Sequence, residues 1–373
     1  MTARPKGTPR RVLMTVDAVG GVWRYAIDLA AALNRQGIGC LLVGSGPRLG
    51  SALAFGRLAL PDTELVWTDM PLDWLITDEA LLEGAPDMLA GLARDRGCDL
   101  LHLNLPSQAA GIAGHLPVVV VSHSCVPTWW DCMRDTPLPH EWAWQRRRNR
   151  EGLDRADAVL APSGSHAAAL VRVYGPRPNL SVVHNATSAV PSTDAKEPFV
   201  LAAGRWWDEG KNAAILDRAA QSAPWPVWMA GPLEGPNGQK ISVAHAQAPG
   251  ELPAAAMDGL MRRAAIFAAP SRYEPFGLAV LEAATHHTAL VLSDIPTFRE
   301  LWDDAALFVA PDDAPGFTHA ITRLAQDAEL RERLASRATS IAGRFTPARQ
   351  LEGICAAYAG AMTRRHHTMR EVG

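Results

Sequence analysis

The chain has 373 residues, of which 48% are hydrophobic and 20% are charged. This length and composition are typical of a globular protein with two domains, each with its own core. The formal net charge of −3 argues against a general nucleic-acid binder, which would carry a basic excess.

The cysteines form no metal-binding or disulfide pattern, since none lies in a C-x-x-C pair. We expect reduced, mostly buried thiols in a cytoplasmic protein. No apolar run of about 18 residues occurs, so we expect no membrane span. The basic start, residues 1–11, is not followed by an apolar stretch that resembles a signal peptide. The cysteines are Cys40, Cys98, Cys125, Cys132 and Cys355.

The first half of the chain alternates apolar strands with helical patterns. An apolar run at 11–16 leads into Gly20 and Gly21, and an amphipathic helix is predicted over 22–36. This order is typical of a doubly wound parallel sheet. Further strands are predicted over 39–44, 99–103, 117–122, 158–161 and 180–184.

The second half repeats the pattern after a Pro- and charge-rich stretch at 191–198, which predicts a linker. We therefore predict an α/β protein with a first domain over 1–190 and a second over 191–345. Both are Rossmann-like and face each other, with ligands bound in the cleft at the carboxyl ends of the strands. Strands are predicted over 199–203, 227–230, 265–269 and 289–293, and helices over 212–220, 254–263 and from 313 onward.

The segment 274–284 carries the strongest local signal. A helix is predicted to begin near Gly277 or Leu278, and its free amide groups would bind an anion. Gly277 lets the backbone turn tightly and approach a ligand closely. Glu274 precedes the helix and Glu282 lies inside it. One carboxylate can therefore reach each end of a ligand whose phosphates lie on the helix terminus.

The stretch from Glu274 to Glu282 reads E-P-F-G-L-A-V-L-E and resembles the E-x7-E motif of retaining GT-B glycosyltransferases. The resemblance is to their family-4-like group, related to glycogen synthases. Gly204, Arg205 and Lys211 resemble that group's diphosphate-binding segment. Other matching segments are the glycine pair at 20–21, the strand 119–123, and the segments 181–185 and 293–300, in the expected order over about 11–312.

The resemblance implies a GT-B architecture, a nucleotide-sugar donor as substrate, no cofactor and no metal. It also implies that the helix at 348–362 crosses back to the first domain, as part of a C-terminal segment 346–373. The implied catalytic residues are Glu274, His123, Arg205 and Lys211, and the implied donor-binding residues are Glu282, Phe276, Gly277, Leu278, Gly20, Gly21 and Gly204.

The implied mechanism follows from the charges that develop during the reaction. When the bond between the anomeric carbon and phosphate breaks, negative charge grows on the leaving diphosphate. Arg205, Lys211 and the amides near Gly277 would stabilise it without a metal ion. By the resemblance, Glu274 and His123 would contact the sugar. We favour attack on the same face, assisted by the leaving phosphate.

Two departures from the group's pattern change loop shape and leave the charged donor contacts intact. Trp206 and Trp207 lie between Arg205 and Lys211, and they pack either on the donor or on the cleft. Asn185 is followed by Ala186, where the group has glycine.

The sequence signals for an acceptor site are less specific than those for the donor site. Trp129 and Trp130 flank a Pro-rich loop and either stack on a sugar acceptor or pack within the fold. A basic run beside them meets anionic lipid head groups or a diphosphate-linked acceptor, or it forms a solvated helix face. Lipid contact would place the protein at the inner membrane face. The run consists of Arg146, Arg147, Arg148 and Arg150.

The alternatives are a GT-B sugar-nucleotide epimerase, which needs no acceptor, and a non-catalytic protein that binds a nucleotide-sugar. A phosphorylase is disfavoured because no lysine is marked for pyridoxal phosphate. The segment 230–253 is expected to recognise the base, but it carries no code for uridine, guanosine or adenosine. Carbohydrate, lipid-linked and small-molecule acceptors all fit the sequence.

Overall fold

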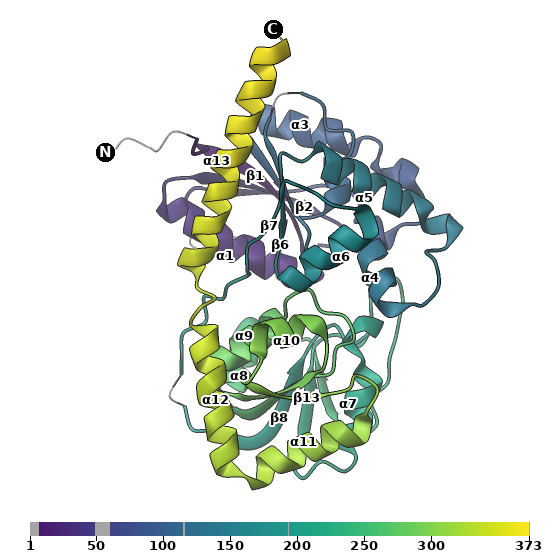
Figure 1. The fold of residues 1–373 in the computed structure, drawn as a ribbon, viewed down its shortest axis with the longest axis vertical. Coiled ribbons are helices and arrows are strands. Elements are labelled where there is room, and N and C mark those ends of the chain that lie inside the picture. Colours follow the sequence, from purple (N-terminus) through teal and green to yellow (C-terminus); the bar gives the residue numbers. More distant parts are fainter. Residues whose placement is uncertain (1–6, 49–59, 115, 193, 373) are drawn as a thin grey trace. The chain divides into compact units, whose positions relative to one another are not determined.

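The structure is a computed structural model that describes residues 7–48, 60–114, 116–192 and 194–372. The chain divides into two compact units (Figure 1). Unit 1 contains residues 1–185 and 347–373, and unit 2 contains residues 186–346. The chain therefore passes from one unit to the other twice.

Unit 1 is built on a sheet of seven parallel strands in the order β3-β2-β1-β4-β5-β6-β7. The chain builds outward from β1 to β3 and then returns to the other side of β1. The order therefore reverses between β1 and β4, where doubly wound sheets bind ligands. The strands are β1 (Arg11–Asp17), β2 (Gly39–Ser45), β3 (Thr63–Trp67), β4 (Leu100–Leu103), β5 (Val118–Val121), β6 (Ala158–Ala161) and β7 (Leu180–Val182).

Helices pack on both faces of this sheet. The strands β1, β4, β5 and β6, whose residues are mostly apolar, are therefore buried along nearly their whole length. The C-terminal helix α13 contributes Ile354, Tyr358 and Ala361 to the core, where they lie with Val12 and Met14. The helices are α1 (Gly21–Arg35), α3 (Ala85–Asp95), α4 (Val126–Met133), α5 (Ala143–Arg155), α6 (Gly164–Tyr174) and α13 (Pro347–Val372).

Unit 2 repeats the topology with six parallel strands in the order β10-β9-β8-β11-β12-β13. Its order reverses between β8 and β11. The strands are β8 (Glu197–Ala203), β9 (Val227–Ala230), β10 (Gln247–Gly250), β11 (Ala264–Ala269), β12 (Ala289–Ser293) and β13 (Ala306–Val309).

Two apolar clusters fill the two faces of this second sheet. Leu201 and Phe267 point into one cluster, and their neighbours Val200 and Ile266 point into the other, as alternation along a strand requires. The helices that cover the faces are α7 (Ala213–Ala220), α8 (Ala254–Arg263), α9 (Leu278–Thr285), α10 (Pro296–Trp302), α11 (Ala314–Gln326) and α12 (Ala328–Ala342).

The cysteines are all free. Cys40, Cys98 and Cys125 are buried, whereas Cys132 is exposed and Cys355 is partly exposed. Over the described part of the chain, no helix combines the length and apolarity needed to span a bilayer.

Candidate functional site

The predicted donor residues of unit 2 meet where its strand order reverses. β8 and β11 are hydrogen-bonded neighbours, so their carboxyl ends lie side by side. Gly204 and Arg205 follow β8, and the loop to Glu274 follows β11. Segments about 70 residues apart in the sequence thus form one edge of the sheet.

A short 3-10 turn, Glu209–Lys211, is fastened to the β11 loop. The Gly210 carbonyl accepts the backbone N–H groups of Arg272 at 2.9 Å and Tyr273 at 3.3 Å. Asn212, in the left-handed conformation with φ 59°, donates its side-chain amide to the carbonyls of Pro270 (2.9 Å) and Pro311 (2.6 Å). These bonds fix the position of Lys211 relative to the loop.

Lys211 forms an ion pair with Glu274. The two side chains are only 18% and 16% exposed, so solvent screens the pair less than it screens a surface pair. The structure thus brings together two of the four residues predicted to be catalytic.

Arg205 is oriented by Asp208 and Trp207. Its Nη2 donates to Asp208 Oδ2 at 3.2 Å, and its guanidinium carbon Cζ lies 5.6 Å from the centre of the Trp207 ring. Asp208 Oδ1 also accepts the Gly210 N–H at 2.9 Å, so one carboxylate shapes the turn and holds the arginine. Trp206 instead belongs to the core, where it is 2% exposed and donates its indole N–H to the Ala230 carbonyl.

Gly277 immediately precedes α9 and adopts φ 92°, a conformation that is strained for residues with a side chain. A Cβ there would lie 3.0 Å from Phe298. The free amides of α9 begin at Leu278, and Glu282 is half-buried further along the helix. Phe276 is 2% exposed and packs edge-on against Phe345, so its side chain serves the core and only its backbone remains for a ligand.

The predicted glycine loop of unit 1 lies at the carboxyl end of β1. Gly21 is the first residue of α1, and Gly20 precedes it in an extended conformation, with φ −150°. Gly20 therefore needs no special conformational freedom, and what it provides is the absence of a side chain. The turn is shaped by Asp17, whose Oδ1 accepts the Val19 N–H at 2.9 Å.

His123 lies just beyond β5. Its Nε2 is 2.9 Å from Asn104 Oδ1, and the Tyr25 ring lies edge-on at 4.5 Å. Burial, with smaller contributions from His102 and His166, lowers the pKa of His123 to about 3. The imidazole is therefore neutral at pH 7.

A buried polar chain lies behind His123. The His102 ring joins two tyrosine hydroxyls, with Nε2 at 3.3 Å from Tyr25 and Nδ1 at 2.8 Å from Tyr358 on α13. Burial lowers the pKa of His102 to about 3. The C-terminal helix is thereby hydrogen-bonded to the strand that leads to Asn104.

Trp129 and Trp130 lie on α4, directly after the His123 loop. Their rings are partly exposed, and Trp130 packs edge-on against Trp142 at 5.6 Å. The Arg134 guanidinium lies 5.0 Å and 5.5 Å from the ring centres of Trp129 and Trp130. The result is a small aromatic surface with a cation over it.

The basic run on α5 is exposed at three of its four arginines, so the structure corrects the predicted lipid contact only for the buried Arg148. Arg148 is 8% exposed and donates to the Leu82 carbonyl, so it cannot meet lipid head groups. Arg146 and Arg150 donate to carbonyls at the end of α6, and Arg147 pairs with Glu79.

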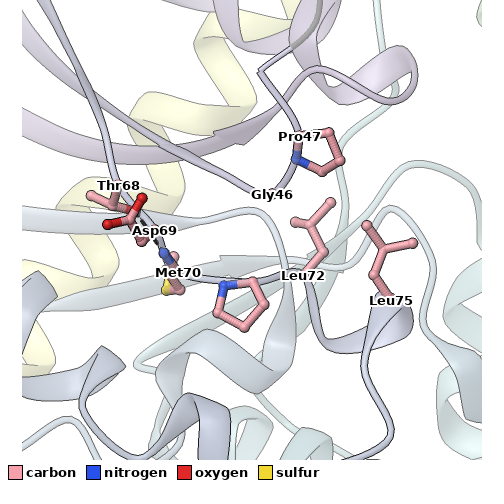
Figure 2. Close-up of a pocket in the computed structure, with 8 residues that line it drawn as sticks. Gly46, Pro47, Thr68, Asp69, Met70, Leu72 and Leu75 are labelled. Carbon is pink, nitrogen blue, oxygen red and sulfur yellow. Dashed lines mark hydrogen bonds between the residues drawn. The ribbon is translucent and has the colours of Figure 1, made fainter. Parts of the chain in front are cut away.

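A separate depression of about 320 Å³ lies beyond the carboxyl ends of β2 and β3 (Figure 2). Asp69 and Thr68 bring a carboxylate and a hydroxyl to a wall that also includes Pro47, Leu72 and Leu75. None of the predicted donor residues lines it.

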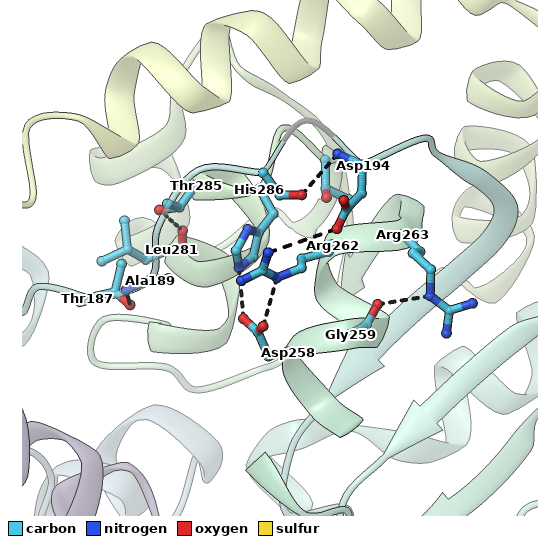
Figure 3. A network of polar contacts seen from close by, with 12 residues as sticks. Thr187, Ala189, Asp194, Asp258, Gly259, Arg262, Arg263, Leu281, Thr285 and His286 are labelled. Atoms are coloured by element: carbon cyan, nitrogen blue, oxygen red, sulfur yellow. Dashed lines mark hydrogen bonds and ion pairs between the residues drawn. The ribbon is translucent and has the colours of Figure 1, made fainter. Parts of the chain in front are cut away.

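A polar cluster at the amino edge of the second sheet has a structural role (Figure 3). Lys196, just before β8, donates to the carbonyls of Arg262 (2.7 Å) and His286 (2.6 Å) and to Thr288 Oγ1 (3.1 Å). Arg262 in turn pairs with Asp258 at 2.7 Å. The cluster joins the starts of three strands at the edge opposite the predicted donor residues. Within the described ranges, no group of three His, Cys, Asp or Glu side chains is arranged to hold a metal ion.

Sequence reasoning missed three residues that orient predicted site residues, namely Asn104 in unit 1 and Asp208 and Asn212 in unit 2. Asn104 carried a usable signal, because a polar residue directly after the buried strand β4 lies at the order reversal of a doubly wound sheet. Asp208 and Asn212 act through turn geometry and gave no such signal.

Two family models match the chain. The model for Glycosyltransferase Family 4 matches residues 19–189, and the model for Glycosyl transferases group 1 matches residues 238–340. The first match lies mostly in unit 1 and the second lies in unit 2.

Solved structures share the fold over nearly the whole chain. Sucrose-phosphate synthase from Thermosynechococcus elongatus superimposes with a TM-score of 0.74 at 17% identity, over 98% of this chain and all of that one. The Anabaena protein HepE, solved in complex with UDP-glucose, gives a TM-score of 0.72 at 19% identity, over 92% of this chain and 98% of that one. The fold is therefore that of the GT-B glycosyltransferases.

Curated relatives match shorter segments. The chain is 38% identical over 74 residues to the alpha-D-kanosaminyltransferase of Streptomyces kanamyceticus, which is 19% of each protein. It is 25% identical over 172 residues to the O-antigen chain mannosyltransferase B of Escherichia coli, 46% of this chain and 40% of that protein. The matches thus span less than half the length of these relatives. The two family models together match most of the chain and show that it belongs to the family-4-like group of GT-B glycosyltransferases.

Proposed function

We propose that the protein is a retaining glycosyltransferase that moves a sugar from a nucleotide-diphosphate-sugar to a hydroxyl acceptor without a metal ion. One observation carries the proposal: Arg205, the Lys211–Glu274 pair and the start of α9 converge where the strand order of unit 2 reverses. Two cations and a helix terminus supply positive charge for a diphosphate, and the carboxylate accepts hydroxyl groups.

The departing diphosphate is stabilised by positive groups already in place. Asp208 and Trp207 hold the Arg205 guanidinium, and the Gly210 contacts hold Lys211. Preorganised charge of this kind acts on the transition state without reorganisation. Arg205 forms a fork-like phosphate contact and Lys211 a point contact. These groups perform the charge neutralisation that a divalent cation provides in other transferases.

Glu274 holds hydroxyls of the donor sugar, Glu282 holds the ribose, and His123 contacts the sugar. The acceptor hydroxyl attacks from the face that the diphosphate leaves, and a leaving phosphate oxygen takes its proton. HepE in complex with UDP-glucose supports a nucleotide-sugar donor of this type. The kanosaminyl- and mannosyltransferase relatives support transfer of a hexose.

A thermal-shift screen in EDTA tests the donor site. Uridine, guanosine and adenosine diphosphates and their sugar forms are added to the purified protein, and a ligand of the folded state raises Tm. We expect a shift with one nucleotide, lost in Arg205→Ala and Glu282→Ala and kept in Arg218→Ala. Arg218 is an exposed arginine on α7 and serves as the matched control. A shift that requires added Mg²⁺ contradicts metal independence.

Product analysis separates the candidate activities. Slow hydrolysis of the donor to free sugar, and transfer when an acceptor is added, support a transferase. An epimerised donor identifies an epimerase, and binding without turnover identifies a binding protein. Proton NMR of the first-formed product is expected to show the anomeric configuration of the donor. A covalent sugar adduct trapped on Glu274 would overturn same-face attack.

A further inference from the structure

Asn104 is fixed on three sides within unit 1. Its backbone N–H donates to Thr15 Oγ1 at 2.8 Å, and its side-chain amide Nδ2 donates to the Thr15 carbonyl at 2.6 Å. Thr15 Oγ1 donates onward to Gln108 Oε1 at 2.6 Å. Asn104 and Thr15 are 2% and 0% exposed. The amide therefore has a single orientation, with Oδ1 directed at His123.

That orientation determines which nitrogen of His123 carries the proton. Asn104 Oδ1 lies 2.9 Å from His123 Nε2, and a carbonyl oxygen only accepts hydrogen bonds. Nε2 must therefore donate. A neutral imidazole has one donor and one acceptor nitrogen, so Nδ1 carries the lone pair.

The surroundings keep the ring neutral. The titratable groups around it are His102 on β4, His166 on α6 and Tyr25 on α1. Burial lowers the pKa of His102 to about 3 and that of His166 to about 4, and it raises the pKa of Tyr25. These groups are thus uncharged at pH 5–8, and none supplies the negative charge that would favour an imidazolium.

We propose that Asn104 is a positioning residue that holds His123 as the Nε2–H tautomer, so that Nδ1 accepts a hydrogen bond from one hydroxyl of the donor sugar. The contact with the sugar rests on the proposed function, whereas the tautomer is a property of the free protein. His123 then favours donor sugars that carry this hydroxyl group. A deoxy sugar that lacks this hydroxyl binds less well.

The tautomer is tested first, by two-bond ¹H–¹⁵N NMR of protein labelled with ¹⁵N-histidine. The His123→Gln spectrum assigns the ring. We expect an Nε2–H signal that does not titrate between pH 5 and 8. In Asn104→Ala the ring should show mixed tautomers. In Asn104→Asp it should keep Nε2–H but become protonated at higher pH, because the carboxylate favours the imidazolium.

Kinetics test the contact with the sugar. Losing one hydrogen bond of ordinary strength predicts a fall of about five- to tenfold in kcat/KM for Asn104→Ala. Asn104→Asp should add an acidic limb to the pH profile of kcat/KM. Asn179→Ala, which removes an amide that donates to the Ala156 carbonyl, is the matched control and should leave both readouts unchanged.

Each outcome decides one part of the proposal. An Nδ1–H signal or an imidazolium at pH 7 in the wild type overturns the tautomer, as does an unaltered tautomer in Asn104→Ala. A correct tautomer with unchanged kinetics in Asn104→Ala overturns the contact with the sugar. If the wild type turns over no donor, the proposed function fails with that contact, and the spectra still decide the role of Asn104.

Discussion

Lys211 and Glu274 form an ion pair although they lie 63 positions apart, and each side chain is more than four-fifths covered. The pair forms because β8 and β11 are neighbours in the sheet. It keeps a cation and a carboxylate in place at the proposed donor site before any ligand binds.

Replacing Lys211 tests whether this cation stabilises the leaving group. Lys211→Ala should lower kcat by about 10²-fold, the usual cost of removing one donor to a developing anion. Lys211→Arg keeps the charge and should recover part of the loss. Steady-state rates with a nucleotide-sugar give the comparison. Arg263→Ala, which breaks an exposed pair with Glu197, is the control and should leave kcat unchanged. An unchanged rate in Lys211→Ala would remove it from the mechanism.

The conformation of Gly277 predicts a cost for any side chain there. Gly277→Ala should destabilise unit 2 by about 1–3 kcal/mol, because it forces a positive φ and a contact with Phe298. It should also weaken nucleotide diphosphate binding at α9. Gly259→Ala, in α8 with open space around the added Cβ, should instead stabilise by about 0.5–1 kcal/mol. Urea unfolding of both variants measures the difference, and equal stabilities would contradict the prediction.

The low pKa of His102 predicts that the folded state of unit 1 loses stability as the pH falls. Its folded pKa is about 3 and the ordinary value is 6.5, so the unfolded state binds one more proton between these values. The stability that His102 contributes is full above about pH 6.5 and is lost as the pH falls, by about 1.4 kcal/mol per pH unit. Hydrogen exchange of β4 and β5 peptides at pH 5 and pH 7.5 measures it. His102→Gln should reduce the pH dependence, whereas His319→Gln, at an exposed site, should not.

The Tyr358 hydroxyl is expected to let α13 stabilise β4 through a buried hydrogen bond to His102. Tyr358→Phe removes the partner of His102 Nδ1 at 2.8 Å and should cost about 1–3 kcal/mol, because a buried polar atom is left unsatisfied. Hydrogen exchange in α13 and β4 should rise together. Thr363→Ala, which removes an exposed hydroxyl on the same helix, should have little effect. Faster exchange in α13 alone would mean that the hydroxyl does not connect the two elements.

The aromatic surface on α4 predicts an acceptor effect. Trp129→Ala should raise the KM for the acceptor several-fold and leave the KM for the donor unchanged, since stacking on an aromatic ring contributes about 0.5–1.5 kcal/mol. Asp69→Asn tests the separate depression beyond β2 and β3 in the same assay. A change confined to Asp69→Asn would move the acceptor site to that depression.

The central strands were predictable from sequence and three outer strands were not. β1, β5 and β11 are buried on both faces and read as continuous apolar runs. The missed strands β3, β10 and β13 are at the edges of the two sheets, where each has one neighbour among the described strands. β3 and β10 contain polar residues, proline or glycine, whereas β13 is apolar but only four residues long.

That Lys211 and Glu274 lie together in unit 2 was predictable, because the motif fixes the type and the spacing of the charged residues. The residues that orient them were not. Asp208 holds Arg205 through a turn, and Asn212 acts from a left-handed conformation, which no periodicity encodes. Trp206 and Phe276 stand next to predicted site residues in the sequence, but their side chains pack in the core. The sequence pattern around an aromatic residue is the same whether its ring faces a ligand or the core.

The placement of α13 in unit 1 has a consequence for synthesis on the ribosome. All of unit 2, residues 186–346, is translated before the helix that covers Val12 and Met14. Unit 2 can fold as soon as it leaves the exit tunnel, whereas the nascent first unit carries an uncovered apolar face until the last helix emerges. Termination of translation near residue 346 would therefore yield a chain in which unit 2 is folded and unit 1 exposes an apolar face to which chaperones bind.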